Sequence, residues 1–358
     1  MNKKLVVFMA TLWGINVTLP AQTVSNVQFE QVDNKVKITY LLDKQADISV
    51  SVSEDGGKTN SSPLQQVSGD VGKSVAAGTK ILWWDVLAER ESLVGSNICF
   101  KVSPSDCDKL SFTVGGVSFT MVYVQGGTFT MGATPEQGTD AFSNEKPAHR
   151  VTLSDYYIGQ TEVTQALWQA VMGTTIRQQR HKATTLGCRL CGVGADYPMY
   201  YVNWSEVTEF CQRLSTLIGR TFVLPTEAQW EYAARGGKLS IGYKYSGSNS
   251  LDAVAWYFLN TGSKKRNRTF PVAQKSPNEL GIYDMSGNVR EWCSDCHDSY
   301  NSSAVSDPTG PMLGSSLYYV TRGGHYYGGA SECRVAYRAS DILDDRTSYI
   351  GFRVVLLR

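Results

Sequence analysis

The stretch that decides the fold reads Gly281-Ile282-Tyr283-Asp284-Met285-Ser286-Gly287-Asn288-Val289-Arg290-Glu291-Trp292. Four other blocks accompany it in a fixed order along the chain. They are 126–132 (GGTFTMG), 145–151 with 161–164 (EKPAHRV and TEVT), 224–237 (LPTEAQWEYAARGG), and 322–324 with 351–354 (RGG and GFRV). One block alone is a weak signal, but five blocks in this order are a strong signal for one fold.

Together the five blocks resemble the formylglycine-generating enzyme family, also called the sulfatase-modifying factor family, over residues 112–358. The resemblance implies an α+β domain with a C-type-lectin-like fold, in which aromatic and glycine-rich loops supply much of the stability. It says less about activity, because one fold hosts many functions.

Family members that make formylglycine bind copper through two cysteines, four and nine residues after the Gly-Gly of the last block. Copper(I) prefers soft thiolate ligands. By resemblance the second cysteine falls on Cys333, whereas the first falls on Gly328, which has no ligating atom. A serine of the enzymes corresponds to His325, and a tryptophan of their substrate groove corresponds to Arg290. The resemblance therefore predicts an atypical or vestigial catalytic site at Cys333 and His325, and it argues against bound copper.

The same resemblance implies a structural calcium site in the quoted stretch. Its ligands fall on the side chains of Asp284 and Glu291 and on the backbone carbonyls of Gly287 and Val289. Calcium prefers several oxygen ligands that include carboxylates, and a tight glycine turn brings such oxygens together. The alternative is a plain turn in which Asp284 only accepts hydrogen bonds from local amides.

The start of the chain has the features of a secretory signal. Lys3 and Lys4 precede an apolar run, 5–17, that is too short to span a bilayer. Leu19-Pro20-Ala21 follows as the expected cleavage site, with cleavage after Ala21. These features predict a signal peptide over 1–21 and an exported protein that is periplasmic, cell-surface or secreted. A buried N-terminal strand is the alternative interpretation.

Residues 22–105 show the period-two alternation of half-buried strands, as in Val36, Ile38 and Tyr40 or Ile48, Val50 and Val52. Turn signals such as 54–57 (EDGG) separate the alternating runs. The pattern predicts an all-β sandwich domain of the immunoglobulin or fibronectin kind. The segment 104–106 (PSD) is the expected linker to the second domain.

Three helices are expected in the second domain. Asn203 with Glu206, and Thr226 with Gln229, have the spacing of capping boxes and precede apolar residues at helical intervals. The segment 162–172 is the third candidate.

Eight cysteines include two C-x-x-C pairs, Cys188 with Cys191 and Cys293 with Cys296. An even number of cysteines in an exported chain favours disulfides, so we expect these four to be oxidised. Tetrahedral zinc is the alternative, although about a hundred residues separate the two pairs, which is far from zinc-ribbon spacing.

The net charge of +1 and the lack of basic runs give no indication of nucleic-acid binding, and no apolar segment is long enough for a membrane span. Three functions remain open. The first is a non-catalytic module that binds a peptide, a glycan or an envelope protein. The second is an atypical formylglycine-generating oxidase acting on a sulfatase-type cysteine or serine. The third is a structural component of a cell-envelope complex.

Overall fold

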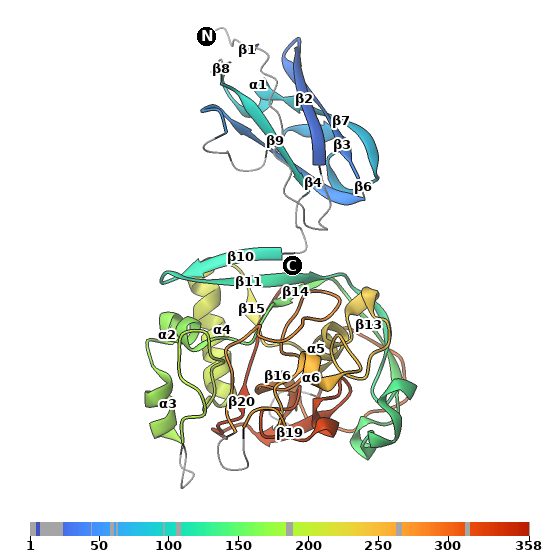
Figure 1. The fold of residues 1–358 in the computed structure, drawn as a ribbon, viewed down its shortest axis with the longest axis vertical. Helices are drawn as coiled ribbons and strands as arrows, with labels where there is room; N and C mark the ends of the chain where they lie inside the picture. The colour runs from blue at the N-terminus through green and yellow to red at the C-terminus, as the bar shows by residue number, and fades with distance from the viewer. Residues whose placement is uncertain are drawn as a thin grey trace. The chain divides into compact units, whose positions relative to one another are not determined.

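The computed structural model describes residues 5–7, 24–43, 45–57, 61, 64–95, 97–104, 109–183, 189–262, 267–311 and 316–357. The chain forms two compact units, Met1–Asp108 and Lys109–Arg358, and each is described by itself (Figure 1). Within the described part, no helix has both the length and the apolar character needed to cross a bilayer.

Unit 1, Met1–Asp108, consists of strands that form two main sheets around one core. The first sheet has the order β2-β3-β7-β5, with the strands Val24–Val32, Lys35–Leu42, Gly78–Asp85 and Val67–Gly69. The second has the order β6-β4-β9, with the strands Gly72–Val75, Ala46–Ser53 and Cys99–Pro104. Every pair in both sheets is antiparallel. Val36, Ile38 and Tyr40 are buried, as are Ile48, Val50 and Val52, so the residues that alternate in the sequence face the core.

Three short elements of unit 1 lie outside these two sheets in the described residues. The helical turn α1, Val86–Glu89, begins at Asp85, whose carboxylate accepts a hydrogen bond from the Ala88 amide. Strand β1, Leu5–Val7, pairs in parallel with β8, Leu93–Gly95. Strand β1 lies inside the predicted signal peptide, and the export prediction itself stays a prediction.

Unit 2, Lys109–Arg358, holds three small sheets and all of the longer helices (Figure 1). The largest sheet has the order β10-β11-β14-β21-β15, with the strands Lys109–Val114, Val117–Val124, Tyr156–Gly159, Val355–Leu356 and Phe222–Val223. The second has the order β12-β13-β17, with the strands Gly127–Met131, His149–Leu153 and Val305–Ser306. The third has the order β19-β18-β16-β20, with the strands Arg338–Ile342, Tyr318–Arg322, Arg290–Cys296 and Ile350–Gly351.

The helices of unit 2 begin where the sequence places capping residues. Both predicted capping boxes form, at the start of α4, Trp204–Ile218, and of α5, Glu227–Ala234. The third predicted helix is α2, Gln165–Met172, which begins after Thr164. The other helices and 3-10 turns are α3 Ile176–Lys182, α6 Leu251–Val254, η1 Pro135–Asp140, η2 Ser143–Glu145, η3 Gly237–Leu239 and η4 Ala330–Cys333.

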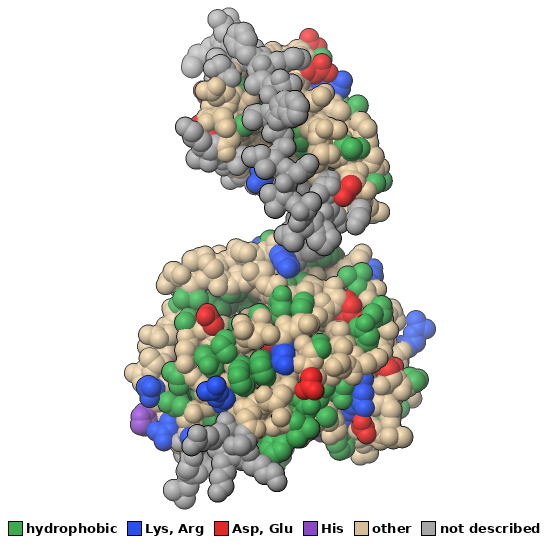
Figure 2. Space-filling view, in the orientation of Figure 1, with side chains coloured by type: hydrophobic (Ala, Val, Ile, Leu, Met, Phe, Trp, Pro, Cys, Tyr) green, Lys and Arg blue, Asp and Glu red, His purple; other side chains and the backbone are tan. Residues whose placement is uncertain are grey.

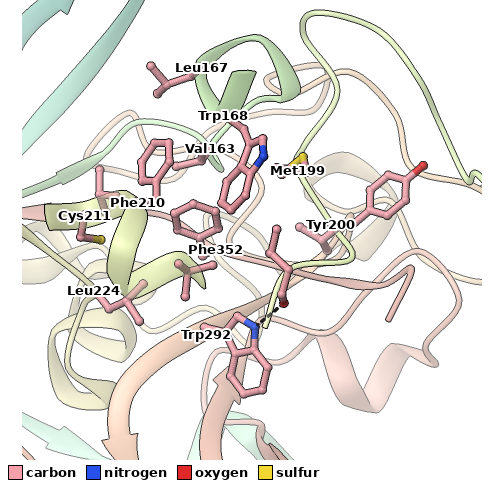
Figure 3. Packing of buried hydrophobic residues seen from close by; sticks show 14 of the residues in the cluster. Val163, Leu167, Trp168, Met199, Tyr200, Phe210, Cys211, Leu224, Trp292 and Phe352 are labelled. Atoms are coloured by element: carbon pink, nitrogen blue, oxygen red, sulfur yellow. Dashed lines mark hydrogen bonds between the residues drawn. The ribbon is translucent and has the colours of Figure 1, made fainter. Parts of the chain in front are cut away.

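Unit 2 has an aromatic core (Figure 3). Trp168 stacks on Phe210 with ring centroids 5.6 Å apart, and both rings meet the edge or face of Phe352. The indole of the buried Trp292 donates a hydrogen bond of 3.0 Å to the Val202 carbonyl. Burial of an aromatic side chain contributes a large apolar area, and a hydrogen-bonded indole avoids the cost of an unpaired donor.

Charged side chains also lie inside unit 2. Arg334 and Glu145 are both fully buried and pair at 2.8 Å, and Arg322 pairs with the buried Glu231. The face drawn in Figure 2 shows both acidic and basic side chains among many uncharged ones, with basic and histidine side chains close together near one edge. The internal pairs are therefore additional to charges at the surface.

The disulfide prediction is not met by the cysteines that the structure describes, because Cys191, Cys293 and Cys296 form no disulfide. Cys188 lies outside the described residues. Cys293 and Cys296 both belong to the strand β16, whose register against β18 shifts between Trp292 and Cys296. Cys293 packs into one core cluster and Cys296 into another, so the two sulfur atoms cannot meet. The zinc alternative has no support either, since no three His, Cys, Asp or Glu side chains of the described segments converge as metal ligands.

Candidate functional site

The loop after β18 brings together the residues predicted to form the catalytic site. Gly324 has φ +69°, and a Cβ atom on it would lie 2.9 Å from the Cys333 sulfur and 2.7 Å from the Glu332 carbonyl oxygen. Only glycine fits such a close approach with a positive φ. The Gly-Gly pair therefore allows η4 to fold back and place Cys333 under the loop.

Cys333 is fully buried and packs in an apolar cluster with Tyr245 and Tyr257. Burial and the nearby Glu332 carboxylate raise the pKa of this thiol to about 12. A thiolate is the form of cysteine that binds metals and attacks substrates. Cys333 is thus held as a neutral, packed side chain at neutral pH.

Gly328 occupies the position of the missing first cysteine. A Cβ atom on Gly328 would lie 3.1 Å from the Glu332 Oε2 atom and 3.3 Å from its carboxyl carbon. The space beside Gly328 therefore contains a carboxylate instead of a thiol. Sequence reasoning did not identify Glu332, because no motif singles out the residue that precedes Cys333.

His325 is buried and stacks on Tyr349, with ring centroids 4.6 Å apart. Burial and the nearby Arg290 lower the pKa of its imidazole to about 3, so the ring is neutral at physiological pH. The Nδ1 atom accepts a hydrogen bond of 3.3 Å from the Tyr327 amide, which assigns the remaining proton to Nε2. Nε2 lies 3.6 Å from the Glu332 Oε2 atom. With Nδ1 engaged and Nε2 protonated, this tautomer has no lone pair available for a metal.

Arg290, at the start of β16, connects these residues. Its guanidinium lies 3.1 Å from Glu332 and 3.4 Å from Asp341, and its central carbon lies 5.8 Å from the rings of both Tyr337 and Tyr349. Arg290 is 8% exposed, and its Nε atom has no hydrogen-bond partner within the described residues. The arrangement is a guanidinium within cation–π distance of two aromatic rings and bordered by two carboxylates. Such a group of side chains can recognise a ligand through ion pairs, hydrogen bonds and ring contacts.

The predicted calcium ligands lie in a second, separate cluster. Gly287 has φ +87°, and a Cβ atom there would lie 2.3 Å from the Trp256 carbonyl oxygen, so glycine is required at this turn. Asp284 accepts a hydrogen bond of 2.7 Å from the Ala273 amide. The turn places Asp284 and Glu291 on the same buried side of unit 2.

The Glu291 carboxylate is already engaged. Arg353 donates to both of its oxygens, at 2.6 and 2.7 Å, and the Trp230 indole donates to Oε2 at 2.7 Å. All three side chains are fully buried. Glu291 is therefore one half of a bidentate ion pair, and calcium would share it with the guanidinium.

Glu162 is a third carboxylate of this cluster that sequence reasoning missed. It accepts hydrogen bonds from the Asn288 side chain at 2.8 Å and the Val289 amide at 2.9 Å. Burial and the neighbouring Asp284 and Glu291 charges raise its pKa well above the ordinary value. Burial likewise raises the pKa of Asp284 to about 6.

The charge of the cluster is compatible with a divalent cation. Three carboxylates face the single guanidinium of Arg353, and a bound cation would balance the excess negative charge. Side chains alone do not complete a site, since no three acidic, histidine or cysteine ligands converge within the described residues. The carbonyls of Gly287 and Val289 would have to supply further ligands.

Comparisons with known proteins match the part of the chain that contains these sites. The model of the sulfatase-modifying factor enzyme 1-like domain matches residues 117–357. Chaperone protein LppX of Paenibacillus barcinonensis is 33% identical in an alignment of 267 positions that covers 62% of this chain and 83% of that protein. The formylglycine-generating enzyme of Streptomyces coelicolor is 30% identical over 284 residues, covering 65% of this chain and 87% of the enzyme.

Solved structures show the same relationship. Treponema denticola variable protein 1 superposes with a TM-score of 0.58 at 32% identity, over 69% of this chain and 98% of that protein. PvdO from Pseudomonas aeruginosa also gives a TM-score of 0.58, at 26% identity, over 70% of this chain and 98% of PvdO. Because the domain match spans more than half of the sequence, this chain belongs to the family of proteins with a sulfatase-modifying factor enzyme 1-like domain.

Proposed function

We propose that this chain is an exported, non-catalytic member of its family, whose unit 2 binds a peptide, a glycan or an envelope protein. One observation carries the proposal: the position of the first copper cysteine is Gly328, and the space beside it contains the Glu332 carboxylate. The remaining cysteine, Cys333, is buried with a pKa of about 12. A pair of thiolates, which copper(I) prefers, has no counterpart here.

We place the ligand site of this proposal at the cluster of Arg290, Glu332 and Asp341. Its supporting features are the buried guanidinium with an unpaired Nε–H, the carboxylates of Glu332 and Asp341, and the ring of Tyr349.

The test is an assay of copper-loaded protein with a sulfatase-type Cys-x-Pro-x-Arg peptide. We expect no conversion of the peptide cysteine to the aldehyde by mass spectrometry and no tight binding in a copper(I) titration. An aldehyde product that disappears in Cys333→Ala would overturn the proposal.

A matched pair of double variants sharpens this test. Gly328→Cys with Glu332→Ala places a thiol where the family has its first cysteine and removes the carboxylate beside it. We expect this variant to gain copper(I) affinity over the natural chain. Gly329→Cys with Glu332→Ala, which moves the thiol by one residue, is the control and should gain less.

We further propose that calcium binds at Asp284 and Glu291 with the carbonyls of Gly287 and Val289. The excess of buried carboxylates over guanidinium groups supports this proposal, and Glu162 adds to that excess. A ligand that binds only the native state raises stability, by about 2.7 kcal/mol at a hundred times its Kd.

A calcium titration followed by thermal unfolding tests this proposal. The natural chain should melt at a higher temperature in calcium, and Asp284→Asn should lose most of the gain. Asp196→Asn, the control, alters an exposed aspartate outside the cluster. This variant should keep the gain in melting temperature. An unchanged melting temperature of the natural chain across the titration would disprove the calcium site.

Export is tested by sequencing the N-terminus of protein recovered from the cell envelope or the medium. Cleavage after Ala21 predicts that the mature chain begins at Gln22. Recovery of the chain with an intact Met1 in the cytosolic fraction would contradict export.

A further inference from the structure

One stretch of unit 2 is basic because it lacks acidic residues. Residues 163–195 contain Lys, Arg and His but no Asp or Glu, whereas the whole chain has 34 Lys and Arg against 33 Asp and Glu. Most of the positive charge of this stretch belongs to helix α3. In Figure 2, basic side chains and a histidine lie close together in the region where Figure 1 shows α3. The balanced charge of the chain therefore conceals a local excess.

Helix α3 directs this charge toward solvent. Ile176 and Gln179 are buried, whereas Arg177, His181 and Lys182 are exposed. Residues three and four positions apart share one side of a helix, so Arg177 neighbours both Arg180 and His181. The basic face of α3 is the group of Arg177, Arg180, His181 and Lys182.

Neighbouring carboxylates do not neutralise this face. Lys182 pairs with Glu206 at 2.8 Å, and Arg346 pairs with the same carboxylate at 3.1 Å, so two cations share one negative charge. Arg177 pairs with no carboxylate of the described residues. The excess of positive charge therefore does not depend on the contacts of Arg180.

The stability of the helix does not explain the charge of Arg177. The helix dipole favours cations in the last turn, and this accounts for Arg180, His181 and Lys182. Arg177 lies in the first turn, where the dipole favours an acidic side chain instead. A partner that carries negative charge would compensate Arg177.

We propose that the basic face of α3 binds an acidic polysaccharide. A row of cations along a helix suits a chain molecule with negative groups at regular intervals, and guanidinium groups bind oxyanions through paired hydrogen bonds. The proposal goes beyond the function proposed above, because it concerns another surface and holds whether or not the cluster of Arg290, Glu332 and Asp341 binds a ligand.

Two other polyanionic partners fit this face less well. Proteins that bind single-stranded nucleic acid use aromatic side chains on which the bases stack, and the described parts of 163–195 expose no aromatic ring of this kind. A helix that binds a membrane surface inserts exposed apolar side chains, but the one large apolar side chain of α3, Ile176, is buried.

Fluorescence anisotropy with labelled dextran sulfate tests the charge preference, and neutral dextran of the same chain length is the matched control. We expect saturable binding of dextran sulfate and no binding of dextran. The affinity should fall at least about tenfold between about 50 and 200 mM salt, because binding releases condensed counterions. No binding of dextran sulfate at low salt, or equal binding of dextran, would overturn the proposal.

Two charge reversals test the location. Arg177 and Arg220 are both exposed, and Arg220 follows the end of α4 that is distant from Glu206 and Lys182. We expect Arg177→Glu to lower the affinity about tenfold and Arg220→Glu to lower it less than about twofold. Arg177→Glu should melt no lower than the natural chain, because an acid in the first turn suits the helix dipole. Equal losses of affinity in the two variants would show that α3 is not the binding surface.

Competition distinguishes a polysaccharide from other polyanions. Double-stranded DNA and phosphatidylglycerol vesicles, at equal total charge, should displace labelled dextran sulfate at least about tenfold less well than the unlabelled polymer does. DNA or vesicles that compete equally well would overturn the assignment to a polysaccharide. None of these results bears on the copper assay, so a failure here is distinguishable from a failure of the function proposed above.

Discussion

The two units of this chain place their ion pairs in opposite environments. In unit 1 the pairs are at the surface, as in Lys35 with Asp85, whose side chains are 52% and 39% exposed. In unit 2, Arg353 with Glu291 and Arg334 with Glu145 have no exposed side-chain surface at all. The core of unit 1 is apolar, built by residues such as Leu82 and Trp84, whereas the core of unit 2 is part aromatic and part ionic.

This difference shows two ways of specifying a fold. An apolar core tolerates changes of shape if volume and pattern are kept. A buried ion pair contributes little net stability, yet loss of one partner leaves an uncompensated charge in a region of low dielectric. Unit 1 should therefore respond to mutation gradually, and unit 2 should fail sharply when one member of a pair is removed.

The largest effect is expected from Arg353→Met. This change removes the guanidinium and leaves the Glu291 carboxylate buried beside Asp284 and Glu162. The free energy of unfolding of unit 2 should fall by about 3–5 kcal/mol. Chemical denaturation followed by tryptophan fluorescence measures the cost. A loss below about 1 kcal/mol would contradict the view that unit 2 depends on its internal pairs.

Leu82→Ala should have the next largest effect, and it should act on unit 1. Leu82 is fully buried in the apolar core, and truncation of such a residue costs about 2–5 kcal/mol, depending on how far the cavity closes. Calorimetry should resolve separate unfolding transitions for the two units. Only the transition of unit 1 should move to a lower temperature. A comparable shift of the unit 2 transition would show that the two cores are coupled.

The carboxylate cluster should make the stability of unit 2 depend on pH in the absence of calcium. The pKa of Asp284 is raised to about 6, so the folded chain keeps a proton that the unfolded chain releases near pH 4. The stabilisation is complete below about pH 4 and is lost as the pH rises through about 6, a change on the order of 2–3 kcal/mol. Melting temperatures across this range should fall more steeply for the natural chain than for Asp284→Asn, and parallel curves would refute the assignment.

The smallest effect is expected from Lys37→Ala in unit 1. Lys37 pairs with Glu30 at 2.8 Å, but their side chains are 29% and 47% exposed, so water screens the pair. Surface pairs of this kind contribute about 0–1 kcal/mol. At both low and high salt, Lys37→Ala should have nearly the same denaturation midpoint as the natural chain. A fall of more than about 2 kcal/mol in the free energy of unfolding of unit 1 would remove the contrast between the two units.

The strands and helices were largely predictable from the sequence, because they follow from local rules. Period-two alternation located β3 and β4, and the capping residues Asn203 and Thr226 located the starts of α4 and α5. Helix α3 was not predicted, although Thr175 and Gln178 form a capping box at its start. The C-type-lectin-like arrangement of unit 2 stays a prediction.

The site was less predictable, because its contacts join residues far apart in the sequence. The family pattern pointed to Cys333, His325 and Arg290, and the loop does bring them near one another. No pattern indicated that Glu332 fills the space beside Gly328 or that Glu162 joins Asp284. The even cysteine count also misled, because Cys293 and Cys296 lie on the strand β16 and pack into different core clusters.

The packing of Cys293 and Cys296 in two different core clusters gives the molecule a built-in pair of kinetic probes. Each thiol reports on a different core cluster, and both are buried. An alkylating reagent can reach such a sulfur atom only while its surroundings are open. Equal labelling rates would mean that β16 is released in one cooperative step. Unequal rates would show which of the two core clusters opens first, without any mutation.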